Sequence, residues 1–190
     1  MSEIYIIEHL EPELGKWCLI EYAHISKIVG KANLWFTNIK NDKDTHKLRE
    51  SGKIFRESVS KLKLENACIL DPEAKKTLTI QEAKNFKYFI FGGILGDFPP
   101  KKRTSRELTR FVKGEIRNIG KEQMSTDNAI YTVKQICRGK ELTKLQFQDN
   151  LEIKFDKVMS LELPYRYNLV KGKPLISPEL VRFLKKKKGF

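Results

Sequence analysis

KYFIFGGILGDFPP, at residues 87–100, is the segment from which the fold can best be inferred. Its apolar and aromatic run at residues 88–91 is typical of a fully buried strand in a parallel sheet. Gly92, Gly93 and Gly96 follow, and glycine is favoured where the backbone turns sharply or where another group approaches closely. The two prolines at the end prevent a helix from continuing. A buried strand that runs into such a loop is a usual place for a ligand crevice in an α/β sheet.

The glycine spacing narrows the possible ligands. It is GGxxG, which differs from the GxGxxG of dinucleotide-binding folds and from the GxxxxGK[ST] of phosphate-binding loops. Taken alone, the segment is equally compatible with a tight turn that binds nothing.

The rest of the chain alternates short apolar runs with segments of helical composition. The expected strands are residues 4–7, 34–37, 67–70, 88–91 and 115–118. The expected helices are residues 16–29, 47–64 with a break at Gly52, 104–112, 128–138 and 178–188. This alternation predicts an α/β fold with a mostly parallel sheet flanked by helices. The length of 190 residues fits a single domain over residues 1–190.

Two further segments are expected to be extended. Apolar residues on either side of Asp149 and Asn150 suggest a hairpin over residues 145–155. Residues 161–170 contain Pro164, which predicts an edge strand because proline cannot donate a ladder hydrogen bond.

The chain is strongly basic. It carries 37 Lys and Arg against 24 Asp and Glu, a net charge of +13. Such an excess attracts polyanions, which suggests contact with nucleic acid or a ribonucleoprotein. The alternative is the general Lys and Glu usage of a thermophile proteome.

Cysteine and histidine usage predicts no metal site. Cys18, Cys68 and Cys137 are far apart and lack a CxxC spacing, so we expect buried free thiols in a reducing cytoplasm. The N-terminal residues show no signal-peptide pattern, and no apolar run approaches the ~20 residues of a membrane helix.

A second loop, NIGKEQMSTDNAI at residues 118–130, forms a pair with FGGILGD at residues 91–97, which is called the glycine loop below. Together the loops resemble those of the SPOUT class of α/β-knotted methyltransferases, which bind S-adenosylmethionine. In that class the C-terminal part of the domain threads through a loop to form a trefoil knot. The resemblance therefore implies a C-terminal trefoil knot and S-adenosylmethionine as cofactor.

The resemblance extends to one family within this class. The motifs that carry it are IIEHLEP (6–12), LIEY (19–22), ILDP (69–72), FGGILGDFPP (91–100), RTSRELT (103–109), QMSTDNAI (123–130) and LPYRY (163–167). The fungal member of the family methylates an arginine of a small-subunit ribosomal protein, and archaeal relatives are named as predicted RNA methyltransferases. Residues 38–64 and the lysine run at 185–188 carry no such resemblance.

By position, the resemblance implies a cofactor site on three segments. The implied cofactor-binding residues are Leu70, Asp71, Pro72, Gly92, Gly93, Ile94, Leu95, Gly96, Asp97, Ile119, Gly120, Met124, Ser125 and Thr126. Met124 by itself is more often simply a core residue, and residues 125–127 by themselves are more often a helix N-cap.

Carboxylates near the transferable methyl group would suit an acceptor that must lose a proton. An arginine guanidinium is held charged, so paired carboxylates would grip it and take its proton. Asp97, directly after the glycine loop, and Glu8, at the end of the first strand, are the predicted catalytic residues. The predicted substrate-binding residues are Glu8, His9, Glu21 and Asp127.

Three function classes remain open. The first is a protein-arginine methyltransferase acting on a ribosomal protein, which the acidic candidates favour. The second is an RNA base methyltransferase, which the net charge favours slightly. The third is a non-catalytic RNA- or ribosome-binding module. The sequence does not fix the oligomeric state, monomer or homodimer: most knotted methyltransferases dimerise, but the family that the chain resembles belongs to a monomeric branch.

Overall fold

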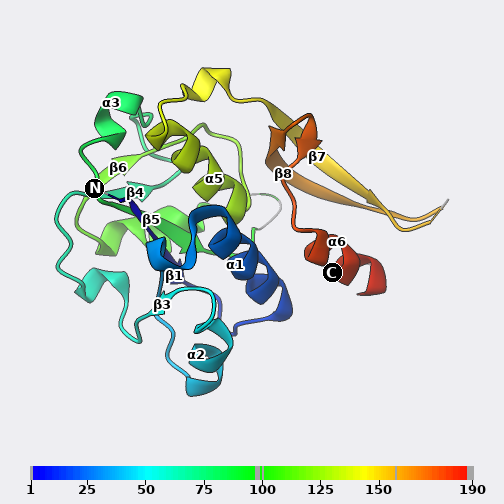
Figure 1. The fold of residues 1–190 in the computed structure, drawn as a ribbon, viewed down its shortest axis with the longest axis horizontal. Helices are drawn as coiled ribbons and strands as arrows, with labels where there is room; N and C mark the ends of the chain where they lie inside the picture. The colour runs from blue at the N-terminus through cyan, green and yellow to red at the C-terminus, as the bar shows by residue number, and fades with distance from the viewer. Residues whose placement is uncertain (1, 97–98, 100, 157, 188–190) are drawn as a thin grey trace.

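The computed structural model describes residues 2–96, 99, 101–156 and 158–187. A six-stranded sheet forms its centre (Figure 1). Its strands are β1 (Ile4–His9), β2 (Leu34–Thr37), β3 (Lys53–Ile54), β4 (Ala67–Leu70), β5 (Tyr88–Gly93) and β6 (Glu115–Arg117). They lie in the order β3-β2-β1-β5-β4-β6, and each neighbouring pair is parallel. The predicted α/β fold with a mostly parallel sheet is confirmed.

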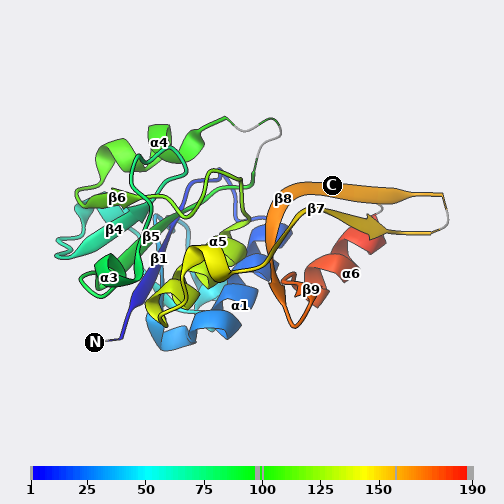
Figure 2. The same ribbon diagram turned by 90° about the horizontal axis from the view of Figure 1, so that it is seen from above.

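The helices flank this sheet, except for one that packs against a second, smaller sheet. They are α1 (Lys16–Val29), α2 (Asp42–Leu48), α3 (Ile80–Ala83), α4 (Arg103–Glu107), α5 (Thr126–Cys137) and α6 (Pro178–Lys187), with short 3-10 turns at Lys31–Asn33, Val59–Lys61, Thr109–Phe111 and Leu142–Lys144. Figure 2 shows α1, α3 and α5 on one face and α4 on the other. No helix in the described part of the chain is long and apolar enough to cross a membrane.

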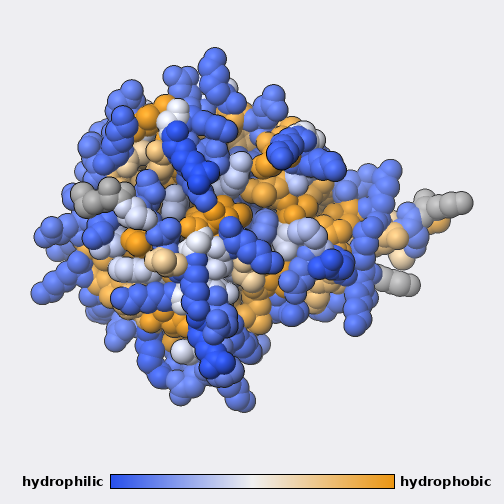
Figure 3. Space-filling model, viewed as in Figure 1, coloured by the Kyte–Doolittle hydropathy of each residue, from blue (hydrophilic) through white to orange (hydrophobic). Residues whose placement is uncertain are grey.

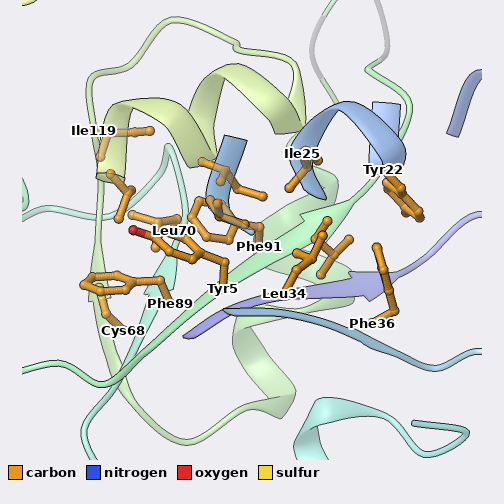
Figure 4. Close-up of a cluster of buried hydrophobic side chains, with 14 of the residues drawn as sticks. Tyr5, Tyr22, Ile25, Leu34, Phe36, Cys68, Leu70, Phe89, Phe91 and Ile119 are labelled. Atoms are coloured by element: carbon orange, nitrogen blue, oxygen red, sulfur yellow. The ribbon is translucent and has the colours of Figure 1, made fainter. Parts of the chain in front are cut away.

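Strand alternation divides the core into two layers. Tyr5 and Phe89 point toward α1 and α5, where they join the largest buried cluster (Figure 4). Ile6 and Ile90 point to the opposite face, where they pack with Val59 from the 3-10 turn. Buried side chains on both faces explain why these strands are nearly continuous apolar runs.

A second sheet forms an antiparallel arm. It consists of β7 (Phe147–Lys154), β8 (Ser160–Val170) and β9 (Lys173–Pro174), in the order β7-β8-β9. The β7–β8 hairpin projects away from the larger sheet, and α6 lies along it (Figures 1 and 2). Leu163, Tyr165 and Leu180 belong to a separate buried cluster that joins the arm to Ile20 of α1.

Two local predictions were wrong. Residues 47–64 are not mostly helical: α2 ends at Leu48, and the chain then forms β3 and a 3-10 turn. A Cβ at Gly52 would lie 2.4 Å from the carbonyl oxygen of Leu34, so the chain comes too close to β2 for any larger residue. The hairpin expected within residues 145–155 is instead one strand, β7, with a bulge at Asn150, whose φ is 57°.

The expected edge position of Pro164 holds only locally. β8 lies in the middle of its sheet, but β9 pairs only with Leu169 and Val170. At Pro164 the sheet therefore consists of β7 and β8 alone. Because β9 does not reach this position, the missing amide of proline costs no hydrogen bond to β9.

The first test concerns the core. Phe89 is fully buried, so Phe89→Ala should lower the free energy of unfolding by about 3–5 kcal/mol through lost contacts and a cavity. Phe111 is 56% exposed, and the matched variant Phe111→Ala should cost less than about 1 kcal/mol. Urea denaturation measures both, and equal losses would contradict this assignment of the core.

Candidate functional site

A cavity of about 180 Å³ lies at the carboxyl ends of β4 and β5 and beside the loop that follows β6. In a parallel sheet this edge is where ligands commonly bind. Its apolar lining comes from Leu70, Phe91, Ile94, Ile119 and Met124. Its polar lining comes from Asp71, Glu73, Lys101, Lys102, Arg103, Thr104, Lys121, Glu122, Gln123 and Thr126. The cavity thus combines an apolar wall with charged groups of both signs.

The base of the arm holds the two loops of the cavity together. The Tyr165 hydroxyl donates to the carbonyl oxygen of Gly96 at 2.8 Å. The Arg166 amide donates to the carbonyl oxygen of Gln123, also at 2.8 Å. A Cβ at Gly96 would lie 2.2 Å from Gln123 Nε2 and 2.6 Å from Tyr165 Cε1, so this close approach requires glycine.

Glu11 connects the glycine loop to α4. Its Oε1 accepts from the Leu95 amide at 2.9 Å and from Arg103 Nη1 at 2.7 Å. Arg103 also makes a two-point contact with Glu107, at 2.8 and 3.1 Å. The bonds from Glu107 and then Glu11 raise the pKa of Arg103 above its ordinary value. One carboxylate oxygen therefore fixes both the glycine loop and a cation that lines the cavity.

Asp71 is held in a fixed orientation at the end of β4. Its Oδ2 accepts from the Thr109 hydroxyl at 2.6 Å, and its Oδ1 accepts from the Glu73 amide at 2.9 Å. Asp71 is buried, so these bonds offset the cost of removing its charge from water. This part of the lining is preorganised.

The N-terminus of α5 forms another wall, and α1 supplies its cap. Ser125 occupies the N-cap position but makes no side-chain cap bond; its hydroxyl donates to Asp127 Oδ1 at 2.6 Å. Glu21 instead accepts from the Asp127 amide at 3.2 Å. The other Asp127 oxygen lies 2.8 Å from His24 Nδ1. Burial and then the Asp127 charge raise the pKa of Glu21 well above the ordinary carboxyl value.

Glu8 and His9 lie outside the lining of the cavity. Glu8 is 3% exposed, and its Oε2 accepts from the Thr37 hydroxyl at 2.5 Å and from the Val59 amide at 2.9 Å. Its carboxylate thus holds the 3-10 turn against β1. His9 points to the other face, with Nδ1 3.0 Å from the Tyr22 hydroxyl, and burial lowers its pKa.

The structure gathers most, but not all, of the predicted cofactor residues. Those that line the cavity are Leu70, Asp71, Pro72, Gly92, Ile94, Gly96, Ile119, Gly120, Met124 and Thr126. Three do not. A Cβ at Gly93 would meet the Tyr22 hydroxyl at 2.3 Å, so Gly93 faces α1; Leu95 contributes its amide to Glu11; and Ser125 bonds to Asp127. Asp97 lies outside the described residues.

The four predicted substrate-binding residues do not form one site. Glu21 and Asp127 meet between α1 and α5, whereas Glu8 and His9 lie on opposite faces of β1. All four are buried, and none lines the cavity. Their roles toward a substrate stay predictions.

Comparison with known proteins identifies the family. The profile described as "Protein arginine N-methyltransferase SFM1-like" matches residues 4–189. The chain belongs to this family. The resemblance inferred from the sequence motifs is therefore confirmed, and so is the methyltransferase class of the enzyme.

Relatives of known structure agree with this assignment. Protein arginine N-methyltransferase SFM1 of Saccharomyces cerevisiae (strain ATCC 204508 / S288c) is 35% identical over 201 residues, which cover 96% of this chain and 94% of the relative. Crystal structures of yeast SFM1 complexed with SAH and with SAM each match with a TM-score of 0.86 at 32% identity. The match to the SAH complex covers 95% of this chain and 94% of the yeast chain. The match to the SAM complex covers 98% of this chain and 92% of the yeast chain.

A more distant structure shares only the fold. A dual specific Trm10 from Thermococcus kodakaraensis matches with a TM-score of 0.57 at 19% identity, over 74% of this chain and 95% of its own. The sheet and its helices thus resemble those of SPOUT methyltransferases.

Several residues of this SFM1-like site were missed from the sequence. Glu11, Gln123 and Tyr165 make contacts that join segments distant in the sequence, and no spacing pattern indicates such contacts. The lysines at 101 and 102 were visible as part of a basic run, but nothing in the sequence placed that run at the cavity. Among the described residues, no group of three or more His, Cys, Asp or Glu side chains could hold a metal ion.

The raised pKa of Glu21 predicts a pH dependence of stability. The folded state favours the protonated carboxyl, so its stabilising effect is complete below the ordinary carboxyl pKa and is lost as pH rises through the raised value. Glu21→Gln keeps an acceptor for the Asp127 amide without this titration. Its free energy of unfolding should exceed that of the wild type increasingly from about pH 5 to pH 9, by about 1–3 kcal/mol at the upper end.

Urea denaturation across this pH range tests the expectation. The control is Glu65→Gln, which removes an exposed carboxylate. A constant difference between Glu21→Gln and the wild type would show that Glu21 does not titrate in this range.

Proposed function

We propose that this chain is an S-adenosylmethionine-dependent methyltransferase of a ribosome-associated substrate, and specifically of an arginine in a small-subunit ribosomal protein. The observation that carries the proposal is the cavity between the glycine loop and the 119–126 loop, in a chain of the SFM1-like family. The SAM- and SAH-bound structures of yeast SFM1 support the same cofactor here.

The lining suits S-adenosylmethionine. Leu70, Ile119 and Met124 offer an apolar surface for a purine face, and backbone groups of the glycine loop can approach closely. Gly120 also lines the cavity; its φ of 105° favours glycine, and its amide donates to Asn118 Oδ1 at 3.1 Å, which fixes the backbone of this loop. The cations Lys101 and Lys121 suit the carboxylate of the methionine part.

When bound, the cofactor supplies a methyl group already activated on a sulfonium. The protein must then align the acceptor nitrogen with that methyl, exclude water and accept a proton. As the new N–C bond forms, the S–C bond breaks and its electron pair stays on sulfur, and the acceptor nitrogen gives its proton to a carboxylate. An arginine needs this last step because its guanidinium is charged at rest.

Glu122 and Asp97 are the acids that suit this role. Glu122 lines the cavity and is exposed, and it makes no hydrogen bond or ion pair to any described residue. Asp71 and Glu73 also line the cavity, but Asp71 is bonded to Thr109, and Glu73 accepts from Lys102 at 2.6 Å. We propose Asp97 as the base on its position in the sequence, and Glu122 as its partner in gripping the guanidinium.

An RNA substrate is the second candidate. The observation in its favour is the set of cations in the lining, Lys101, Lys102, Arg103 and Lys121. Arg103 is neutralised by Glu11 and Glu107, and Lys102 is paired with Glu73, which reduces the charge available to phosphate. The arginine substrate therefore remains the first candidate.

Further features belong to the same proposal. We propose that the segment from β6 to α5 forms the trefoil knot of the SPOUT class, since the loop at 119–126 lies against the glycine loop and α5 packs on the same face as α1. A single catalytic domain over residues 1–190 and a cytoplasmic location complete the proposal.

Binding is tested through Gly96. The protein should bind S-adenosylmethionine in the micromolar range, about −8 kcal/mol. Gly96→Ala should weaken binding at least tenfold, because the added methyl group would push Gln123 and Tyr165 away from the loop. Isothermal titration measures the affinity, with Gly15→Ala as control since a Cβ there meets nothing within 4 Å. Unchanged binding in Gly96→Ala would separate the loop from the cofactor site.

Turnover is tested with labelled methyl donor and ribosomal subunits, followed by separation of protein from RNA. We expect label in a protein of the small subunit. Asp97→Asn should lower turnover by about 10²–10⁴, as expected for a positioned base, and leave cofactor affinity within a few fold. Glu122→Gln should mainly raise the KM for the substrate.

Two outcomes would contradict this scheme. Label in RNA would establish the second candidate. Cofactor binding without transfer to any ribosomal component would leave a non-catalytic binding module.

A further inference from the structure

The arm is strongly cationic. The arm is defined here as residues 147–187, with β7, β8, β9 and α6. These residues include nine Lys and Arg against five Asp and Glu. Hydrophilic side chains line both edges of the arm where it projects from the body (Figure 3). Nothing in the proposed methyl transfer uses this charge.

Helix α6 separates its apolar and charged residues. Leu180 and Leu184 are buried against the hairpin and belong to the arm's apolar cluster. Arg182 and the three lysines 185–187 are exposed. The helix is therefore anchored by one side, and its cations face solvent on the other.

These cations are not neutralised within the described part of the chain. Arg182 and Lys185–Lys187 form no ion pair there, and Lys187 only lies over the Phe183 ring at 5.3 Å.

Most of the arm's acids are engaged elsewhere. Asp149 is paired with Arg166, Glu152 lies 4.0 Å from Lys154, and Glu179 lies 4.0 Å from Lys16. Asp156 accepts from the amides of Val158 and Met159. Among the described residues of the arm, Glu162 is the one acid with neither an ion pair nor a hydrogen bond, so the positive field of α6 is largely uncompensated there.

The position of the arm connects this charge to the cavity. The same strand that projects outward contacts both cavity loops at its base, through Tyr165 on Gly96 and Arg166 on Gln123. The arm therefore begins at the two loops that border the cavity. Lysines in sequence on a helix end point in different directions, which suits contact with a flexible phosphate backbone.

We propose that the arm is an RNA-binding surface, on which Arg182 and Lys185–Lys187 contact backbone phosphates. It would hold a ribonucleoprotein by its RNA while the cavity receives the residue to be methylated. RNA is favoured over a membrane because the apolar face of α6 is buried in the arm and cannot enter a bilayer. The inference extends the proposed function, but RNA binding by the arm can be measured without it.

The test measures binding of a fluorescein-labelled RNA hairpin by anisotropy between 50 and 200 mM salt. The variant Lys185→Ala/Lys186→Ala/Lys187→Ala removes three charges from α6. The matched control Lys40→Ala/Lys43→Ala/Lys63→Ala removes three exposed lysines of the main body that likewise form no ion pair with any described residue.

The arm variant should bind at least tenfold more weakly than the wild type. Its slope of log K against log salt should be shallower by about 2–3, since each phosphate contact contributes about 0.7–0.9. The control should change affinity less than threefold. Equal losses in both variants would show only the effect of net charge, and no loss in the arm variant would show a solvated lysine run; either result overturns the proposal.

Two further measurements test whether RNA is the preferred partner of the arm and whether methyl transfer itself depends on the arm. Polyglutamate and phosphatidylserine vesicles should bind at least tenfold more weakly than RNA at 150 mM salt; equal arm-dependent binding would overturn RNA as the partner. Methyl transfer to an isolated, RNA-free ribosomal protein should be the same in the wild type and the arm variant. The anisotropy result stands whether or not any methyl transfer is detected, so the two proposals can fail separately.

Discussion

The start of α5 is buried between α1 and β8, and its backbone amides need hydrogen-bond partners there. Glu21 of α1 provides one partner by accepting from the Asp127 amide. From the other side, the Asn128 side chain accepts from the Asn168 amide at 2.8 Å and donates to the Leu175 carbonyl at 2.9 Å. The position of α5, and with it one wall of the cavity, depends on both sets of bonds. A single helix end thus couples the main body to the arm.

The other walls of the cavity are also held by polar side chains that bond to two segments at once. Glu11 accepts hydrogen bonds from both the glycine loop and Arg103, so one carboxylate links the two segments. Asp71 does the same for the end of β4 and the turn that contains Thr109. Carboxylates that bridge segments leave few free acids at the cavity. This is why the exposed Glu122 stands out as a group available to a substrate.

The regular part of the fold could be predicted because periodicity is a local property. The helix at residues 16–29 and the strands at 34–37 and 67–70 were predicted with the bounds that the structure has. The region 47–64 failed because its close approach to β2 at Gly52 is a tertiary constraint. The hairpin predicted around Asn150 was wrong because a residue typical of turns can equally form a bulge within one strand. At the site, the motif resemblance placed the loops correctly. It could not show that Gly93 faces α1, or that the Glu8 carboxylate accepts a hydrogen bond from the Val59 amide.

The attachment of the arm to both cavity loops has a consequence for synthesis. The strand that completes the cavity is β8, and Tyr165 and Asn168 lie near the end of the chain. During translation, the earlier loops can therefore form only an open, unsupported edge until β8 has left the ribosome. Contacts between such distant positions also close slowly. A chain that stops before β8 would keep every residue of the glycine loop and of α5, but it would lack the contacts that Tyr165 and Arg166 make to the two cavity loops.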